Sequence, residues 1–458
     1  MSNLVWFRSD LRALDNQALH NAFESGETHA CIFLPVTQLA KYGHGERKIR
    51  FLRDSYQKLT AELNELGISV TSKEVDNFHS QKNCILDLCR ERGIQKVFWN
   101  NEYPLDERLR DLQLEKSLKA LNIEVNQFDD CLVLPPHQIS TGSGEFYRVF
   151  SPFKRAWLNC FEQQKQSLIG RLNPPDKPST EIQGLRNFIT GQINNYRDQR
   201  DFPALDATSH LSASLSVGTI SPLRALTEAL ASNRGDPSGG SEGISTWISQ
   251  LIWREFYYHL IARCNSISKN QPFIKATENL DWNTPDETLE RWKEGTTGIP
   301  IVDAGMRQLL VSGWMHNRLR MITAMFLSKN LFIDWRYGEK HFLQHLQDGD
   351  FALNNGGWQW SASTGTDAAP YFRVFNPFTQ AQRFDPDARF IKQFVPELEP
   401  LPAEVIHSEA KLASHRPKSY PEALVNTVES RKKAIAAFKN LNNLNQSKSN
   451  YSSQELYK

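Results

Sequence analysis

Short apolar runs and amphipathic segments alternate along the first 128 residues. Five apolar runs predict β-strands, because runs of this length between polar segments are typical of buried strands: 4–7, 30–36, 68–72, 96–100 and 123–128. Four amphipathic segments predict the helices between them: 15–24, 46–66, 80–92 and 105–121. This alternation favours a doubly wound parallel sheet. The first loop, FRSDLRALDN, lacks the G-x-G-x-x-G fingerprint of dinucleotide-binding folds.

The pattern changes after residue 128. Residues 129–186 contain proline pairs and polar runs, which predict a long linker with one helix near 152–166. From residue 187 the strand pattern disappears, and Ser221-Pro222 gives a capped helix start. Further helical patterns cover 243–263, 286–294, 302–312, 315–329, 337–346 and 386–394.

These patterns predict an α/β N-terminal domain at 1–128, an inter-domain linker at 129–186 and a larger all-α domain at 187–440. The tail at 441–458 has few apolar residues, so we expect it to be disordered.

Composition narrows the class of protein. The six cysteines form no C-x-x-C pair, which excludes a disulfide framework and a zinc site of that type and fits a reducing cytoplasm. The chain has no run of about eighteen apolar residues and no secretory signal, so we expect a cytoplasmic protein. Eight of the eleven tryptophans lie between Trp247 and Trp360. This clustering of tryptophans by itself indicates an aromatic core, an aromatic ligand site or a redox relay.

The stretch DGDFALNNGGWQW at 348–360 combines two acids, two asparagines and two indoles. On a helix, Asp350, Asn354 and Trp358 share one face, because they are spaced at i, i+4 and i+8. An anion, an amide and an indole in line suit a flat, nitrogen-rich aromatic ligand. No glutamate closes a twelve-residue calcium loop after Asp348, so we expect no metal.

The segment 243–260 has an apolar back and an aromatic, polar front. Gln250, Trp253, Arg254 and Tyr257 share the front, with Trp247 at its border. The pattern is typical of a helix that lines a cleft, or of a surface helix whose long side chains reach water.

Two further clusters could bind anions. The hydroxyl-rich residues 208–212 precede a helical stretch, where they can cap the helix or hold a phosphate. In GWMHNRLRM, Arg318 is either a solvated surface charge or a phosphate ligand. With a net charge of +1, any nucleic-acid contact needs a local basic patch of this kind.

Five long motifs, in this order, resemble the DNA photolyase/cryptochrome family, most of all its class I cyclobutane pyrimidine dimer photolyases. They are LVWFRSDLRALDN at 4–16, RDFPALDATSHLSASLSVGTISP at 200–222, WISQLIWREFYYHL at 247–260, IPIVDAGMRQLLVSGWMHNRLRMITAMFL at 299–327 and DGDFALNNGGWQWSASTGTDAAPYFRVFNP at 348–377. The resemblance implies FAD in the helical domain, a second antenna chromophore such as methenyltetrahydrofolate, and DNA containing pyrimidine dimers as the partner of a monomer. It implies light-driven repair by electron transfer from reduced FAD.

The resemblance also implies site residues by position. The FAD-binding set is Tyr196, Thr208, Ser209, His210, Leu211, Ser212, Trp247, Arg254, Asn317, Asp348, Gly349, Asp350 and Asn354. The DNA- and lesion-binding set is Arg200, Gln250, Trp253, Arg254, Tyr257, Asn317, Arg318, Met321, Trp360 and Gln380. The catalytic set is Gln250, Asn354 and an electron relay of Trp358, Trp335 and Trp282. Asp106, Glu107 and Lys269 match antenna positions.

Two departures from the family pattern leave alternatives open. Gln250 stands where class I dimer photolyases have glutamate, and an amide cannot give up a proton. A blue-light sensor of the cryptochrome type is therefore a second hypothesis, with the retained Trp253 and Trp360 against it. Ser268 replaces a cysteine near the antenna positions. A light-independent flavin oxidoreductase is a third hypothesis, without a nicotinamide fingerprint in its favour.

Overall fold

The structure is a computed structural model that describes residues 2–172 and 178–455, with side chains described as far as Leu441. The chain divides into two compact units. Unit 1 comprises Met1–Asp198, Ala207–Ser268 and Gln347–Leu353, and unit 2 comprises Gln199–Asp206, Lys269–Leu346 and Asn354–Lys458.

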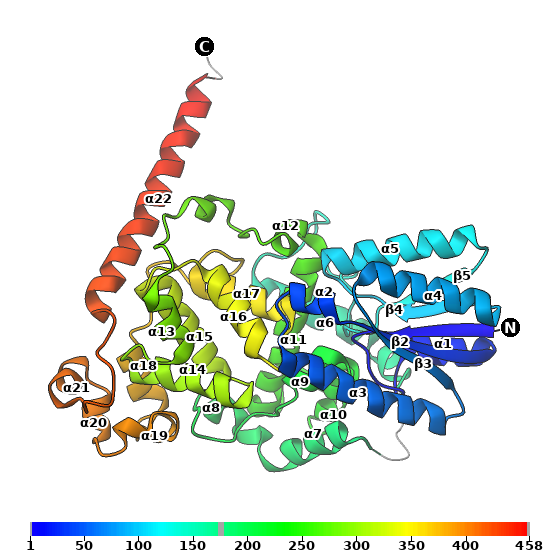
Figure 1. Cartoon of the computed structure of the whole chain (residues 1–458), viewed down its shortest axis with the longest axis horizontal. Coiled ribbons are helices and arrows are strands. Elements are labelled where there is room, and N and C mark those ends of the chain that lie inside the picture. The colour runs from blue at the N-terminus through cyan, green and yellow to red at the C-terminus, as the bar shows by residue number, and fades with distance from the viewer. Residues whose placement is uncertain (1, 173–177, 456–458) are drawn as a thin grey trace. The chain divides into compact units, whose positions relative to one another are not determined.

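Unit 1 begins with a five-stranded parallel sheet in the order β3-β2-β1-β4-β5 (Figure 1). The strands are β1 (Ser2–Phe7), β2 (Glu27–Pro35), β3 (Ser69–Val75), β4 (Lys96–Asn100) and β5 (Glu124–Phe128). The helices between them are α1 (Gln17–Ser25), α2 (Val36–Lys41), α3 (Glu46–Glu65), α4 (Phe78–Arg92) and α5 (Leu105–Ala120). All five predicted strands and all four predicted helices are confirmed, and α2 is an addition.

The sheet is buried on both faces because side chains alternate along each strand. In β1, Val5 and Phe7 pack in a cluster with residues of α1 and α3. Leu4 and Trp6 point to the opposite face and pack with residues of α4 and α5. Two apolar faces covered by helices are the doubly wound architecture that the sequence predicts.

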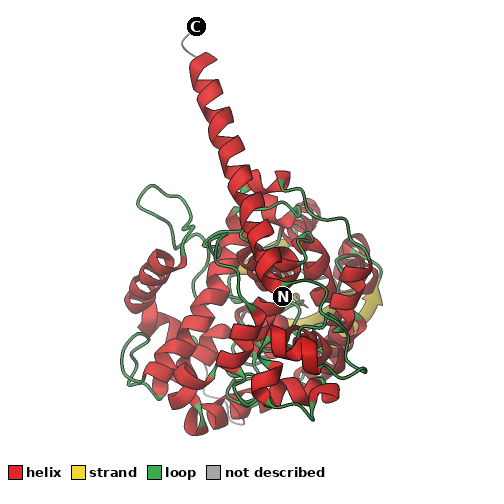
Figure 2. Ribbon diagram, turned by 90° about the vertical axis from the view of Figure 1, so that its left-hand side faces the viewer, coloured by secondary structure: helices red, strands yellow, loops and turns green. Residues whose placement is uncertain are grey.

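The rest of the chain is helical, and Figure 2 shows strands only in the sheet of unit 1. The further helices of unit 1 are α6 (Phe150–Ile169), α7 (Thr180–Gly191), η1 (Ile193–Asn195), α9 (Ser212–Val217), α10 (Pro222–Ala231), α11 (Glu242–Arg263) and α12 (Asn265–Ser268). Helices α8 (Tyr196–Gln199) and α17 (Phe351–Ala362) each contain a point where the chain passes between units. The predicted start of α10 is confirmed, since Ser221 Oγ accepts a hydrogen bond from Arg224 N at 3.0 Å.

Unit 2 packs its helices around a core that includes Trp292, Trp335 and Trp358. Its helices are η2 (Lys275–Asn279), α13 (Glu287–Glu294), α14 (Pro300–Ser312), α15 (Asn317–Met325), α16 (Trp335–His345), α18 (Pro377–Phe384), α19 (Arg389–Phe394), η4 (Pro396–Leu398), α20 (Ala403–Ile406), α21 (Glu409–His415) and α22 (Thr427–Glu455), with a π-helical turn η3 (Phe326–Asn330). The predicted all-α character of this region is confirmed.

Three boundaries differ from the sequence prediction. Helix α7 begins inside the predicted linker, and the predicted helix at 315–329 changes to a π-helical turn after Met325. Helix α22 continues to Glu455, through residues whose polar composition favoured disorder, and residues 456–458 lie outside the described part. No helix among the described residues combines the length and the apolar character needed to cross a bilayer.

Candidate cofactor and DNA site

Two buried carboxylates precede α17 in unit 1. Asp350 acts as the N-terminal cap of this helix, because its Oδ1 accepts a hydrogen bond from Leu353 N at 3.0 Å. Its Oδ2 accepts a short hydrogen bond from the Tyr258 hydroxyl on α11. Asp348 is buried beside it. Burial raises the pKa of Tyr258 above its usual range, so the phenol stays a donor to the carboxylate.

Arg254 on α11 brings a buried cation to the same unit. Its side chain is 7% exposed, and Asp350 is among the groups that raise its pKa against the effect of burial. Its guanidinium lies 4.5 Å from the centroid of the Tyr258 ring, and Nη1 donates to Cys131 O at 2.9 Å. Nη2 donates to Leu215 O at 3.4 Å. Nε is buried without an acceptor in the described part of the chain.

The hydroxyl-rich segment at 208–212 is irregular and leads directly into α9. Thr208 and Ser209 are half-buried, and His210 has a left-handed backbone with φ of 51°. Helix α9 begins after Leu211, which has no polar side chain to cap it. The hydroxyl groups are therefore not committed to capping α9, the simpler of the two interpretations of this cluster.

Helix α11 has the predicted apolar back, with Ile248, Leu251, Ile252 and Phe256 all buried. On its front, Trp253 stacks on Phe150 with ring centroids 3.7 Å apart and ring planes 8° apart. Tyr257 is tilted against Trp253 at 5.8 Å. Phe150 thus covers one face of the Trp253 indole, and the side chain as a whole is half-buried.

Three further predicted residues of unit 1 are Gln250 and Trp247 on α11 and Tyr196 on α8. Gln250 is half-buried, and its Nε2 donates to Thr246 O at 3.3 Å. Trp247 is buried with its ring tilted on Phe188 at 6.4 Å. Tyr196 meets the same Phe188 edge-on at 5.9 Å.

In unit 2, Asn354 belongs to an amide network that the sequence did not predict. Its Nδ2 donates to Glu339 O at 2.9 Å. Asn355 Nδ2 donates to Glu339 Oε1, and Gln359 Nε2 donates to Asn355 Oδ1, both at 2.8 Å. Burial raises the pKa of Glu339 to about 7, so this carboxyl group titrates near neutral pH.

The predicted DNA-facing arginine of unit 2 is held in place by its own protein. Arg318 Nη2 lies 2.6 Å from Asp201 Oδ2, and the guanidinium lies 4.3 Å from the centroid of the Phe384 ring. Arg200 Nε lies 3.9 Å from the other oxygen of Asp201. The other predicted residues here are Asn317, which is exposed with Nδ2 3.9 Å from Met321 Sδ, and the half-buried Trp360 and Gln380.

The three predicted relay tryptophans all lie in unit 2. Trp335 and Trp358 are buried, and Trp282 is half-buried with its ring 4.9 Å from Phe332. The ring contacts shown for Trp358 are with Trp292 at 6.0 Å and with Phe342 at 4.9 Å. The order Trp358, Trp335, Trp282 therefore stays a prediction.

The predicted antenna residues Asp106 and Glu107 form the first turn of α5. The Tyr42 hydroxyl donates to Asp106 Oδ2 at 2.6 Å, and burial raises the pKa of Glu107 to about 7. Ser268 accepts a hydrogen bond from Leu105 N at 3.4 Å. Lys269 is exposed and belongs to unit 2.

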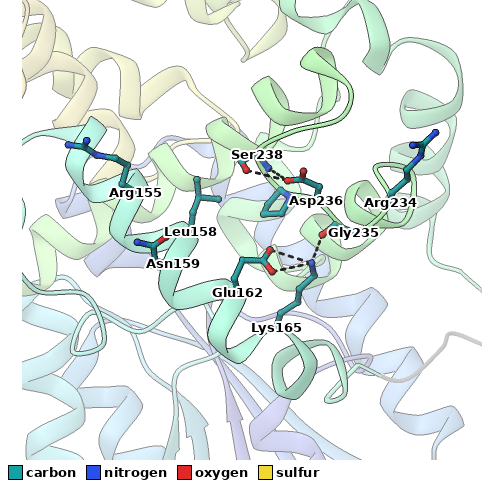
Figure 3. A pocket seen from close by; sticks show the side chains of 10 residues that line it. Arg155, Leu158, Asn159, Glu162, Lys165, Arg234, Gly235, Asp236 and Ser238 are labelled. Atoms are coloured by element: carbon teal, nitrogen blue, oxygen red, sulfur yellow. Dashed lines mark hydrogen bonds and ion pairs between the residues drawn. The ribbon is translucent and has the colours of Figure 1, made fainter.

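A separate pocket of about 510 Å³ in unit 1 contains none of the predicted site residues. It lies between one side of α6, from Arg155 to Lys165, and the loop 234–238 (Figure 3). Lys165 Nζ donates to Gly235 O and lies 3.3 Å from Glu162 Oε1. Among the described residues, no group of three or more histidine, cysteine or acidic side chains could hold a metal ion.

Both halves of the chain match known families. Residues 3–175 match the family described as DNA photolyase, and residues 247–440 match the FAD binding domain of DNA photolyase. The fold and these two matches define a flavoprotein of the photolyase and cryptochrome type. The chain belongs to the DNA photolyase family and carries its FAD-binding domain.

The similar curated proteins are deoxyribodipyrimidine photo-lyases. Those of Escherichia coli (strain K12) and Salmonella typhimurium are 41% and 40% identical, over 95% of this chain and 98% of each relative. Among solved structures, a class III photolyase from Agrobacterium tumefaciens matches with a TM-score of 0.83 and 32% identity, over 96% of this chain and 98% of that one. A Synechocystis cryptochrome matches with a TM-score of 0.82 and 25% identity, over 94% and 99%.

The residues of unit 1 fit FAD. The cofactor carries a diphosphate, hydroxyl groups and two nitrogen-rich ring systems. Arg254 offers a cation with a spare N–H group, and Asp348 and Asp350 offer buried acceptors. The hydroxyl groups at 208–212 can donate to phosphate oxygens. Two functional candidates were not identified from the sequence. Tyr258 donates a hydrogen bond to Asp350, and Lys48 interacts electrostatically with Asp348 and Asp350.

Proposed function

We propose that this chain repairs cyclobutane pyrimidine dimers in DNA with light as the energy source. The observation that carries the proposal is the full-length similarity to deoxyribodipyrimidine photo-lyases, at 41% identity over 95% of this chain. Bound, reduced FAD supplies the electron that splits the dimer after absorbing light. Photolyases are a standard example of enzymes that extrude their target base from the duplex, and a poorly stacked lesion costs least to extrude.

In this proposal the chain's own residues bind FAD, orient it and select the damaged bases. Arg254, Asp350 and the hydroxyl groups at 208–212 hold the cofactor, and Asn354 contacts the edge of its ring. The half-buried Trp253 stacks on the lesion, and Gln250 donates an N–H group to a carbonyl of the dimer. Arg318 contacts a DNA phosphate. Its ion pair with Asp201 holds the guanidinium in one orientation for this contact.

A second chromophore is part of the proposal. A solved photolyase from Sulfolobus tokodaii, 28% identical over 96% of this chain, contains two FAD molecules, one of them suggested as a light-harvesting cofactor. We propose that Asp106 and Glu107 contribute to an antenna site here, with methenyltetrahydrofolate as the candidate pigment. Glu107 can accept or donate a hydrogen bond near neutral pH, because burial raises its pKa to about 7.

A light sensor without repair activity is the alternative. The amide at Gln250 and the structural match to a cryptochrome favour it. A single assay separates the two functions: purified protein with reduced FAD is mixed with a dimer-containing oligonucleotide, in blue light and in the dark. We expect the dimers to be lost in the illuminated sample and to remain in the dark sample. A protein that binds FAD but leaves the dimer intact in both conditions would be a sensor.

Stacking and charge should contribute differently to DNA binding. Trp253→Ala should remove most of the preference for dimer-containing over undamaged DNA, because stacking contributes about 1–3 kcal/mol per base. Arg318→Ala should weaken binding to both DNAs alike and lower the salt dependence of binding by about one ion. Titration of both DNAs at several salt concentrations measures these effects. Unchanged discrimination in Trp253→Ala would remove Trp253 from the lesion site.

Photoreduction tests the proposed relay. Trp282→Phe should slow the accumulation of reduced FAD under blue light with an external reductant, since phenylalanine does not readily give up an electron. Repair by protein that is already reduced should be unchanged. Trp314→Phe is the matched control, because Trp314 is a partly buried indole of the same unit outside the relay. The proposed relay would be refuted if the parent and all three relay variants accumulated reduced FAD at the same rate. These variants are Trp282→Phe, Trp335→Phe and Trp358→Phe.

Gln250 should limit the yield of repair rather than binding. Its amide can donate a hydrogen bond to a thymine carbonyl, but it has no proton to give to the developing radical anion. Gln250→Glu should therefore increase the number of dimers split per absorbed photon with little change in DNA affinity. The measurement is the quantum yield at saturating DNA. A lower yield in Gln250→Glu would show that the site is adapted to the amide.

A further inference from the structure

Lys48 is a buried lysine in the first turn of α3, and no motif of the chain draws attention to it. Its side chain is 4% exposed. It lies on the buried stripe of α3 together with Leu52, Ser55, Leu59 and Leu63, at a helical spacing of four, seven, eleven and fifteen residues. A lysine on such a stripe must leave water, so it needs a partner that compensates for lost hydration.

The partners of Lys48 belong to the proposed FAD site. Its Nζ donates to Ser216 Oγ at 2.6 Å, and Ser216 lies on α9, directly after the hydroxyl-rich segment 208–212. Asp350 and Asp348 act on the same ammonium group and favour its charged form. All of these residues lie in unit 1.

We propose that Lys48 is a positioning residue for FAD: its ammonium group balances the charge of Asp348 and Asp350 and holds α9 against α3. The inference rests on FAD binding by this unit and extends it to the α/β part of the chain, which supplies a charge to the flavin site. Two buried carboxylates beside an anionic diphosphate repel it, and a buried cation offsets that repulsion.

The charge of Lys48 should make FAD affinity depend on pH. Burial lowers the pKa of Lys48 to about 8, and Asp350 and Asp348 oppose the change. Burial and the charge of Lys48 lower the pKa of His44 to about 3, so His44 is neutral throughout this range. Arg254 stays charged. Lys48 therefore carries its charge below pH 8 and loses it above, and FAD affinity should fall between pH 7 and pH 9.

The test compares variants of the full-length apoprotein by fluorescence titration with FAD. Lys48→Met should weaken FAD binding about tenfold at pH 7 and should remove the pH dependence. Lys48→Arg should bind within about threefold of the parent and stay flat to pH 9, because arginine keeps its charge. Ser216→Ala leaves the charge of Lys48 in place, so it should weaken FAD binding less than Lys48→Met does.

Lys154 provides the matched control. It is a half-buried lysine on α6 whose Nζ donates to Ser249 Oγ on α11 at 2.7 Å, and only burial shifts its pKa. Lys154→Met should leave FAD affinity and its pH profile unchanged. Thermal unfolding separates folding from binding: Lys48→Met apoprotein should be less stable than the parent, because the buried Asp348 and Asp350 lose a counter-charge, so FAD affinity is compared at a temperature at which both apoproteins are folded.

Lys48→Met protein that binds FAD as the parent does, or a parent affinity that is flat from pH 7 to pH 9, would overturn the inference. If Lys48→Met does not fold, the pH profiles of the parent and of Lys48→Arg decide, since both carry a cation at pH 7 and only Lys48→Arg keeps it at pH 9. A parent apoprotein that does not bind FAD would contradict FAD binding by this chain rather than the role of Lys48.

Discussion

The burial of charge in unit 1 is the constraint on which the site depends. Asp348 and Asp350 lie out of water in a mostly helical region, where an uncompensated carboxylate would be strongly destabilising. Tyr258, Arg254 and Lys48 compensate for them. These contacts also shape the backbone, because Asp350 starts α17 and the two cations hold the segment that contains α9.

In the proposed site, the same charges allow unit 1 to bind a dinucleotide without a glycine-rich loop. In doubly wound folds, a helix N-terminus after a strand holds the diphosphate. Here α9 is short and begins without a polar cap, so its contribution to anion binding is small. In the proposed FAD site, the side-chain cations Lys48 of α3 and Arg254 of α11 take over this role. Both cations are buried, and we propose that FAD binding offsets the cost of burying them.

The fold was predictable because local patterns determine it. In β1, alternation places Val5 and Phe7 on one face and Leu4 and Trp6 on the other, and short strands separated by helices leave few topologies. Boundaries were less predictable where composition and packing disagree. The polar tail favours disorder, but Phe438 and Leu441 pack against Leu280, which fixes the start of a helix that continues to Glu455.

The sequence proposes residues for the candidate site, but it does not show which side chains they pair with. The resemblance identified Trp253 and Arg318, but Phe150 and Asp201, their partners, are more than a hundred residues away in sequence. Lys48 was missed because α3 also carries Arg47, Arg50 and Arg53, so one more cation looks like a solvated face. Its position on the apolar stripe was the available signal.

The most direct test of this account is a double-mutant cycle between Lys48 and Asp350 on FAD affinity at pH 7. Asp350→Asn keeps the acceptor for Tyr258 and removes the charge, and Lys48→Met removes the opposing charge. If the two groups balance each other at the flavin site, the loss in the double mutant will be smaller than the sum of the single losses by at least about 1 kcal/mol. Losses that add within about 0.5 kcal/mol would contradict it.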